Sequence, residues 1–276
     1  MYPKLFEIGP VPVYSYGLML GLAFLAANYL VTKELKRYRI DENVGLSITF
    51  ISIIAGLLGS KLFYIIEEWN FGKGGTLLSY FRADVLFSPS GLTFYGGLIL
   101  AFVIIWIYCK RKNLYILLIL DALAPATILG YGIARIGCHL SGDGCYGIPV
   151  NGTVWEFLGY SYSKGIVPTH QGVLVHPTSL YELAACVLLF AVLWGIRKKM
   201  KYMGQLFFIY LVFNGLERFL IEFIRLNPIV FSFFTQAQII SLGIFLSGVI
   251  LLYIFRNQNN LNLQSGETGK TRKTEK

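Results

Sequence analysis

Charged residues are scarce in this chain: they make up 14% of its 276 residues, whereas hydrophobic residues make up 55%. An ordinary soluble domain carries about 25% charged residues, so the composition excludes that class. Mean hydropathy is +0.60. This balance is typical of a polytopic membrane protein.

Cysteine and histidine are also rare, with four and three residues respectively. So few cysteines do not make a disulfide framework, although a disulfide between Cys138 and Cys145 stays open. The same short segment holds His139 and Asp143, but the spacing of these four residues matches no familiar zinc pattern. We therefore expect no metal ion and no cofactor.

Seven apolar stretches are long enough to cross about 30 Å of hydrocarbon. The expected spans lie near residues 14–32, 44–66, 92–109, 114–133, 179–196, 203–225 and 231–255. The predicted fold class is an all-α polytopic membrane protein with seven transmembrane helices in one domain, residues 1–255. Residues 256–276 are rich in Asn, Gln, Thr and Lys and are expected to form a disordered tail.

The positive charges predict the orientation of this bundle. Most lysines and arginines follow the odd-numbered spans, at 33–39, 110–112, 197–201 and from 256 onward. Because positively charged loops stay in the cytoplasm, the N-terminus is expected outside and the C-terminus inside. The net charge of +9 is then a topology signal, and no nucleic-acid partner is expected.

Embedded polar groups share one end of the predicted bundle. Arg218, Glu222 and Arg225 lie on an otherwise apolar stretch, where helical spacing stacks them on one face. Ionisable groups within a membrane helix are costly, which makes them functional candidates. The other polar groups expected at this outer end are Tyr16, Lys61, Tyr95, Arg135, His176, Tyr181, Glu182, Thr235 and Gln238, and Tyr95-Gly96-Gly97 opens the third span there.

Each of these residues also has an ordinary structural interpretation. Tyr16 and Tyr95 can belong to the aromatic belt at a membrane interface. Glu222 can simply neutralise Arg218 one turn away, and His176 can precede a helix that begins at a proline. Their shared depth, rather than any single residue, indicates a site in the outer leaflet.

The segment from Gly130 to Gly147 is the strongest local feature. Its glycines permit turns and close approach, and irregular backbone at membrane depth must be buried in protein or line a wet cavity. Arg135 in this segment offers a planar, permanently charged fork suited to phosphate. Several arginines in the outer leaflet indicate an anionic lipid headgroup, which leaves a lipid-phosphate enzyme or a lipid-binding membrane protein.

Longer motifs run along nearly the whole chain. They are Tyr16-Gly17, Phe94-Tyr-Gly-Gly-Leu-Ile99, Ala134-Arg-Ile-Gly137 with Gly142-Asp143, His176-Pro-Thr-Ser-Leu-Tyr-Glu182, Arg218-Phe-Leu-Ile-Glu-Phe-Ile-Arg225, and Thr235, Gln238 and Ser241. In their order and membrane placement, these motifs resemble the prolipoprotein diacylglyceryl transferase family of bacteria.

The resemblance implies a seven-helix enzyme of the bacterial cytoplasmic (inner) membrane, with small periplasmic head and arm segments near 67–91 and 134–178. The implied reaction moves the diacylglyceryl group of phosphatidylglycerol to the lipobox cysteine thiol of a preprolipoprotein, forming a thioether and releasing glycerol phosphate. The implied partners are phosphatidylglycerol and the preprolipoprotein signal peptide. No oligomer is inferred.

The resemblance also implies roles for individual residues. Arg135 and Arg218 would bind and polarise phosphate, and Glu222 would orient Arg218. Asp143 takes the acidic position of the family signature, and Tyr16 would line the lipid site. The remaining expected substrate contacts are Gly96, Gly97, His139, His176, Tyr181 and Arg225.

Two positions depart from the family pattern. The frequent His-Gly-Gly of the family is Tyr95-Gly96-Gly97 here, and the usual Asn of the signature is Cys138. The first departure removes a proposed general base, so Tyr95, His139 and His176 stay open as proton acceptors. It also favours the alternative of a catalytically diverged lipid-binding or lipid-moving protein. A transporter is disfavoured, because the sequence has no midplane charge pathway or broken-helix repeat.

Overall fold

The computed structural model describes residues 1–9, 11–71, 93–231 and 233–256. These residues form seven α-helices, two short 3-10 turns and four short strands. The described residues of Met1–Glu34 and Leu120–Ser265 make one compact unit, called here the first unit. The described residues of Leu35–Ile119 make the second unit.

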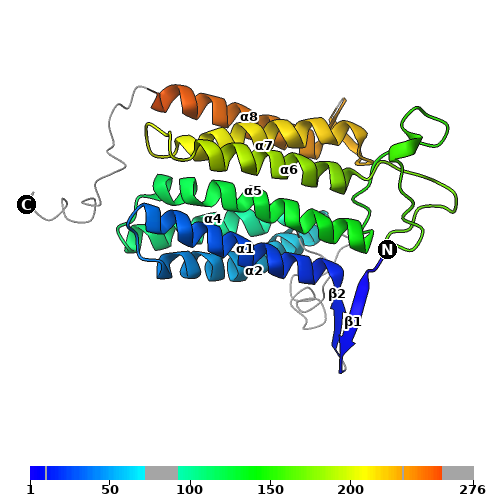
Figure 1. The fold of residues 1–276 in the computed structure, drawn as a ribbon, viewed down its shortest axis with the longest axis horizontal. Helices are drawn as coiled ribbons and strands as arrows, with labels where there is room; N and C mark the ends of the chain where they lie inside the picture. The colour runs from blue at the N-terminus through cyan, green and yellow to red at the C-terminus, as the bar shows by residue number, and fades with distance from the viewer. Residues whose placement is uncertain (10, 72–92, 232, 257–276) are drawn as a thin grey trace, which may run out of the picture. The chain divides into compact units, whose positions relative to one another are not determined.

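Five helices contribute to the first unit (Figure 1). They are α1 (Ser15–Arg37), α5 (Ile116–Ser141), α6 (Thr178–Ile196), α7 (Gln205–Ile221) and α8 (Gln236–Phe255). Within this unit, α7 packs against both α6 and α8. Its apolar core includes the buried residues Ala124, Ile128, Cys186, Leu193 and Leu206.

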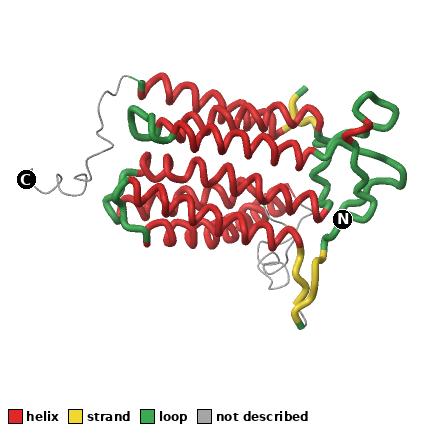
Figure 2. The backbone as a smooth tube through the Cα atoms, viewed as in Figure 1, coloured by secondary structure: helices red, strands yellow, loops and turns green. Residues whose placement is uncertain are grey.

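Two small antiparallel strand pairs accompany these helices, and the sequence predicts neither of them. Strands β1 (Lys4–Ile8) and β2 (Val11–Tyr14) form a hairpin that leads directly into α1 (Figure 2). Strands β3 (Ile229–Phe231) and β4 (Phe234–Thr235) lie between α7 and α8. The expected seventh span begins at 231, whereas α8 begins at Gln236, because the preceding residues pair as strands.

The start of α7 is held by a carboxylate from another helix. Asp121 of α5 accepts hydrogen bonds from the backbone N–H groups of Gly204, at 2.7 Å, and Phe207, at 2.8 Å. These N–H groups have no acceptor within α7, and a negative charge is favourable at the N-terminus of a helix. Asp121 therefore anchors α7 at the end that is opposite to Arg218.

The second unit is built on two helices, α2 (Asn43–Phe71) and α4 (Phe94–Arg111), which pack closely together. A Cβ atom added at Gly96 would overlap the backbone of Gly59 and the side chain of Phe63. Gly96 is thus required for the close approach of these helices. Residues 72–91 of the expected arm and 257–276 of the expected tail lie outside the described residues.

Five of the seven helices are long and apolar enough to cross a membrane: α1, α2, α5, α6 and α8. Helix α7 has 17 residues and α4 has 18. The mostly helical, apolar architecture agrees with the expected class of helical membrane protein. The count of seven spans, the orientation and a single domain over residues 1–255 stay predictions.

Helix α5 is longer than the sequence predicts. Its expected end is residue 133, but the helix continues to Ser141. A Cβ at Gly132 would lie 2.9 Å from the Cβ of Cys186, and one at Gly137 would lie 3.1 Å from the Cα of Tyr16. These glycines therefore permit close packing of helices rather than turns. The irregular backbone that the sequence favours begins only at Gly142.

Candidate functional site

Three arginines converge on the buried carboxylate of Glu182, in the first turns of α6. Arg135 Nη2 lies 2.7 Å from Glu182 Oε2, and Arg225 Nη1 lies 2.9 Å from Glu182 Oε1. Arg218 Nη1 lies 3.6 Å from Oε2. The Glu182 side chain is 0% exposed. One carboxylate thus joins cations from α5, from α7 and from the chain that follows α7.

A second buried carboxylate, Glu222, completes this group. Arg218 Nη2 lies 3.1 Å from Glu222 Oε2, and Arg225 Nε lies 3.9 Å from the same oxygen. Glu222 Oε1 accepts a hydrogen bond of 2.9 Å from the hydroxyl of Thr235. We call Arg135, Arg218, Arg225, Glu182 and Glu222 the arginine site.

The backbone geometry at Arg225 differs from the predicted continuous helix. Helix α7 ends at Ile221, and Glu222–Ile224 form a 3-10 turn. Arg225 has extended backbone, and its neighbour Gly147 pairs with it as an isolated bridge. Arg225 nevertheless reaches Glu182, so the arginine site is assembled by tertiary contacts rather than by one helix face.

Thr235 fixes the position of Glu222 through helix α8. Its hydroxyl accepts the backbone N–H of Gln238 at 3.2 Å, and the Gln238 side chain accepts the backbone N–H of Thr235 at 3.0 Å. This capping box satisfies two N–H groups at the start of α8. The polar pair Thr235 and Gln238, noted in the sequence, therefore positions a carboxylate of the arginine site.

Tyr131 is a residue of this region that the sequence reasoning missed. Its hydroxyl lies between Arg135 and Glu182, donating to the carboxylate and accepting from the guanidinium. The Arg135 guanidinium also lies over the Tyr131 ring, 4.6 Å from the centroid. The available signal was its spacing, because Tyr131 precedes Arg135 by one helical turn.

The ion pairs of the arginine site join three guanidinium groups to two carboxylates. In the part of the chain that the structure describes, Arg135 Nε, Arg218 Nη1 and Arg225 Nε are buried without a hydrogen-bond acceptor. Leaving buried donors unmatched is costly. An anion that reached these N–H groups would supply the missing acceptors.

Glu217, next to Arg218 on α7, was also missed. Both of its carboxylate oxygens are buried, and neither has a hydrogen-bond partner among the described residues. Its charge interacts with those of Glu182 and Arg218. Glu217 thus lies near the arginine site without belonging to its ion pairs.

Asp143 lies in a tight turn directly after α5. Gly142 has φ of +60° and Gly144 has φ of +88°, conformations that favour glycine. Asp143 Oδ1 accepts the backbone N–H of Cys145 at 3.1 Å. Tyr16, from the start of α1, interacts electrostatically with Asp143 and Arg135. The structure therefore brings Tyr16 and Asp143 to the Arg135 side of the arginine site.

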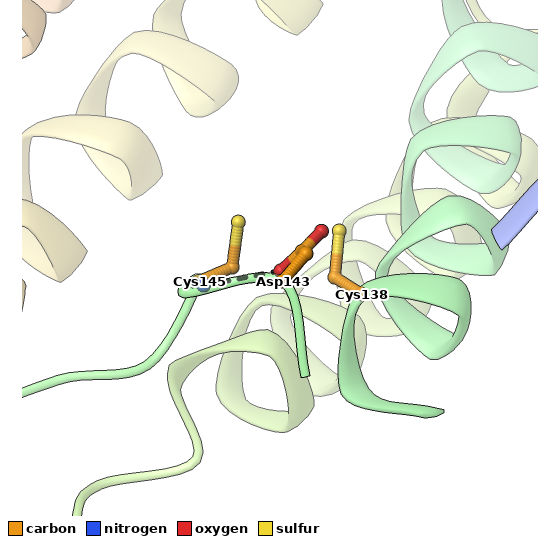
Figure 3. A group of neighbouring side chains, drawn as sticks. All are labelled: Cys138, Asp143 and Cys145. Carbon is orange, nitrogen blue, oxygen red and sulfur yellow. Dashed lines mark hydrogen bonds between the residues drawn. The ribbon is translucent and has the colours of Figure 1, made fainter. Parts of the chain in front are cut away.

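Cys138, near the end of α5, and Cys145, after this turn, lie close together with Asp143 between them (Figure 3). Arg135 Nη1 lies 3.7 Å from Cys138 Sγ and 3.6 Å from Cys145 Sγ. Stabilisation of the thiolate by the neighbouring Cys138 thiol, aided by the charges of Arg135 and Arg225, lowers the pKa of Cys145 to about 6. The sulfurs and an Asp143 oxygen lie within 4.8 Å of one another, which is the spacing of a potential metal site.

Each of the two candidate histidines lies within hydrogen-bond distance of a tyrosine hydroxyl. His139 Nδ1 lies 2.8 Å from the hydroxyl of Tyr162, and its ring packs 4.9 Å from that of Tyr160. His176 Nδ1 lies 3.1 Å from the hydroxyl of Tyr181. His139, His176 and Tyr181 thus pack with the connection between α5 and α6, and their roles toward substrate stay predictions.

Tyr95, Gly96 and Gly97 belong to the second unit, at the start of α4. Gly97 approaches Ser60 and Gly56 of α2 as closely as Gly96 approaches Gly59. The close packing of α2 and α4 is enough to explain why positions 96 and 97 are both glycine. Contact of these three residues with substrate stays a prediction.

The fold and the site define a helical membrane protein in which three arginines meet two buried carboxylates. A family profile described as prolipoprotein diacylglyceryl transferase matches residues 3–254. The chain belongs to this family.

Individual relatives agree over nearly the full length. The chain is 33% identical over 269 residues to a phosphatidylglycerol–prolipoprotein diacylglyceryl transferase of Clostridium tetani, covering 94% of this chain and 100% of the relative. Relatives with the same name from Finegoldia magna and Staphylococcus xylosus are 29% and 30% identical, each over 92% of this chain. They are covered over 95% and 89% of their own lengths.

Proposed function

We propose that this chain transfers the diacylglyceryl group of phosphatidylglycerol to the lipobox cysteine of a preprolipoprotein. The name of the family supports the reaction. The observation that carries the proposal is the arginine site, where three guanidinium groups share two buried carboxylates. Its three guanidinium groups and their unmatched N–H donors suit one phosphodiester.

In the proposed reaction a carbon–sulfur bond forms and a carbon–oxygen bond breaks. The thiolate sulfur of the acceptor attacks the glyceryl carbon that carries the phosphate ester, and the carbon–oxygen bond to phosphate breaks. A thioether forms, glycerol phosphate leaves with the electron pair, and the thiol proton passes to a base. Negative charge grows on the departing phosphate, so preorganised cations stabilise the transition state.

Within this scheme Arg218 and Arg135 contact the phosphate. The Arg218 side chain is 24% exposed, more than those of Arg135, at 12%, and Arg225, at 9%. Arg218 is thus the most exposed side chain of the three. Glu222 and Glu182 hold the guanidinium groups in place, and Arg225 adds positive charge.

The acceptor thiol reacts as its thiolate, whose formation a nearby positive potential favours. Tyr95, His139 and His176 are the candidate proton acceptors. Tyr16 and Asp143, which lie beside Arg135, are proposed to border the lipid. Gly96, Gly97 and Tyr181 complete the proposed substrate contacts.

The proposal includes a location. Seven spans would place the N-terminus outside, the C-terminus in the cytoplasm, and the arginine site in the outer leaflet of the bacterial inner membrane. The charged segments at 33–39, 110–112 and 197–201 support this orientation. Phosphatidylglycerol and the signal peptide of a preprolipoprotein would then enter from the bilayer.

The test is a transfer assay with purified full-length protein, phosphatidylglycerol vesicles and a lipobox peptide, followed by mass spectrometry. The expected product is a peptide whose cysteine carries the diacylglyceryl thioether. The same peptide with serine in place of cysteine is the matched control and should stay unmodified. No adduct, in an assay where a relative is active, would contradict the proposal.

A second candidate is a diverged protein that binds or moves lipid without transfer. The observation that favours it is Tyr95, which stands where the family frequently has histidine. This alternative predicts binding of phosphatidylglycerol without thioether formation. A Tyr95→His variant that gains transfer would support it directly.

A further inference from the structure

Cys138 and Cys145 place their sulfur atoms against the same guanidinium group. Figure 3 shows both side chains pointing to one side of the turn, with Asp143 between them. The sulfurs lie within 4.8 Å of each other and within 3.7 Å of Arg135 Nη1. We propose that these two thiols form a reversible disulfide, which makes the border of the arginine site a redox modification site.

The backbone on either side of Cys145 is held in place by a tight turn and by hydrogen bonds. Gly142 and Gly144, both with positive φ, turn the chain back over the end of α5. The Cys145 carbonyl accepts the hydroxyl of Thr178 at 2.7 Å, and its N–H donates to Asp143. A disulfide needs a sulfur separation of about 2 Å. To form the bond, the two side chains rotate until their sulfur atoms meet.

The two thiols differ in the way that exchange chemistry requires. Cys145 is partly exposed, whereas Cys138 is buried, so a donor in solution reaches Cys145 first. The neighbouring Cys138 thiol and the nearby guanidinium groups also lower the pKa of Cys145, which favours its thiolate. Cys145 is the attacking sulfur, and Cys138 is the resolving one.

The oxidant is a disulfide donor, either a protein disulfide or a small-molecule one. The Cys145 thiolate attacks one donor sulfur, forms a mixed disulfide and releases the other donor sulfur as a thiolate. The Cys138 sulfur then gives up its proton to solvent and attacks Cys145, releasing the second donor thiolate. Two cysteines are oxidised and one disulfide is reduced, and the negative charge beside Arg135 is lost.

A metal ion is the competing occupant of this cluster. Cys138, Asp143 and Cys145 offer three ligand atoms. A bound cation would have to displace or repel Arg135, whose Nη1 contacts both sulfurs and whose Nη2 is paired with Glu182. The guanidinium already supplies the positive charge that two sulfurs and a carboxylate would otherwise attract, and this favours the disulfide.

The test uses the purified full chain in detergent, incubated over a series of oxidised-to-reduced glutathione ratios. Free thiols are then blocked by alkylation, and the protein is digested for mass spectrometry. The expected result is a linked Cys138–Cys145 peptide that a dithiol reductant reverses. Cys109 and Cys186 are buried one on each of two other helices and serve as internal controls, alkylated only after denaturation.

Two matched variants assign the order of attack. Cys138→Ser should retain a glutathione adduct on Cys145, because the resolving thiol is absent. Cys145→Ser should leave Cys138 at least about tenfold less modified, since the attacking thiolate is missing. Both variants are compared by the masses of their cysteine peptides, so the result does not depend on whether the protein is active in the transfer assay.

Several outcomes would overturn the inference. One is the absence of the linked peptide at ratios that already oxidise Cys186. Another is equal glutathione adducts on Cys138 and Cys145 in the two variants. Stoichiometric zinc retained by the wild-type protein, and lost in Cys145→Ser, would make the cluster a metal site instead.

Discussion

Arg225 donates a hydrogen bond of 2.9 Å to Glu182, although 43 residues separate them in the sequence. Arg135 and Arg218 meet the other oxygen of the same carboxylate. Glu182 is therefore the residue on which the arrangement of all three guanidinium groups depends. Its loss would affect both folding and phosphate binding.

Replacing Glu182 with Gln should destabilise the protein by about 3–5 kcal/mol, because three partly buried cations lose their fully buried, charged partner. The measurement is thermal unfolding in detergent, alongside transfer. Glu156→Gln, on an exposed residue of the α5–α6 connection, is the control and should change little. Unchanged stability of the Glu182 variant would show that the arginine site does not depend on it.

Glu217→Gln should have the opposite effect on stability. The Glu217 carboxylate is buried without a hydrogen-bond partner among the described residues, and a neutral amide is less costly to bury than an unmatched charge. We expect a melting temperature equal to or above that of the wild type. A loss as large as that of Glu182→Gln would mean that Glu217 has a stabilising ion pair in solution.

Arg218→Gln should reduce transfer at least about a hundredfold while the protein stays folded, because a donor to the leaving phosphate is removed. Initial rates measured by mass spectrometry give the effect, and circular dichroism gives the fold. Lys164→Gln removes an exposed cation from the connection before α6 and should retain transfer. Near-normal rates for Arg218→Gln would defeat its assignment.

Thr235→Val should lower stability by about 1–2 kcal/mol, because it removes both the cap of α8 and the hydrogen bond to Glu222. Thr235→Ser keeps the hydroxyl and should restore most of the loss. Thermal unfolding compares the two. Equal melting temperatures for the Val and Ser variants would contradict the capping role.

Alkylation of Cys145 should follow an unusual pH profile. Its pKa is about 6, so the rate should rise between about pH 5 and 7 and level off above. Because the folded pKa is depressed, the associated stability is present above the unfolded pKa and is lost as pH falls through 6. Cys138→Ala removes the neighbouring thiol and should shift the profile to higher pH; an unshifted profile would be inconsistent with that cause.

Much of the fold is readable from hydrophobic length alone. All seven apolar stretches contain a helix, because continuous apolar runs of this length leave the backbone no partner except itself. The strand pairs escape this reasoning, since β3 and β4 are short and pair only with each other. The predicted end of α5, at residue 133, is wrong because a glycine is equally compatible with a turn and with a close contact between helices.

The arginine site was readable in part. Arg218, Glu222 and Arg225 stand out as charges in an apolar stretch, and Arg135 stands out in a glycine-rich one. Their convergence on Glu182 is a tertiary contact between segments far apart in the chain, which local spacing does not encode. The cysteine pair against Arg135 depends on a turn with two positive φ values, which no helix pattern specifies.

Helix α7 is tethered at both extremities, by Asp121 at its first turn and by the Glu222–Thr235 link at its last. Because both ends are held, α7 cannot move along its own axis without breaking the contacts of Asp121 and Glu222. Admission of a lipid to Arg218 would then rely on movement of side chains rather than on a shift of α7 along its axis.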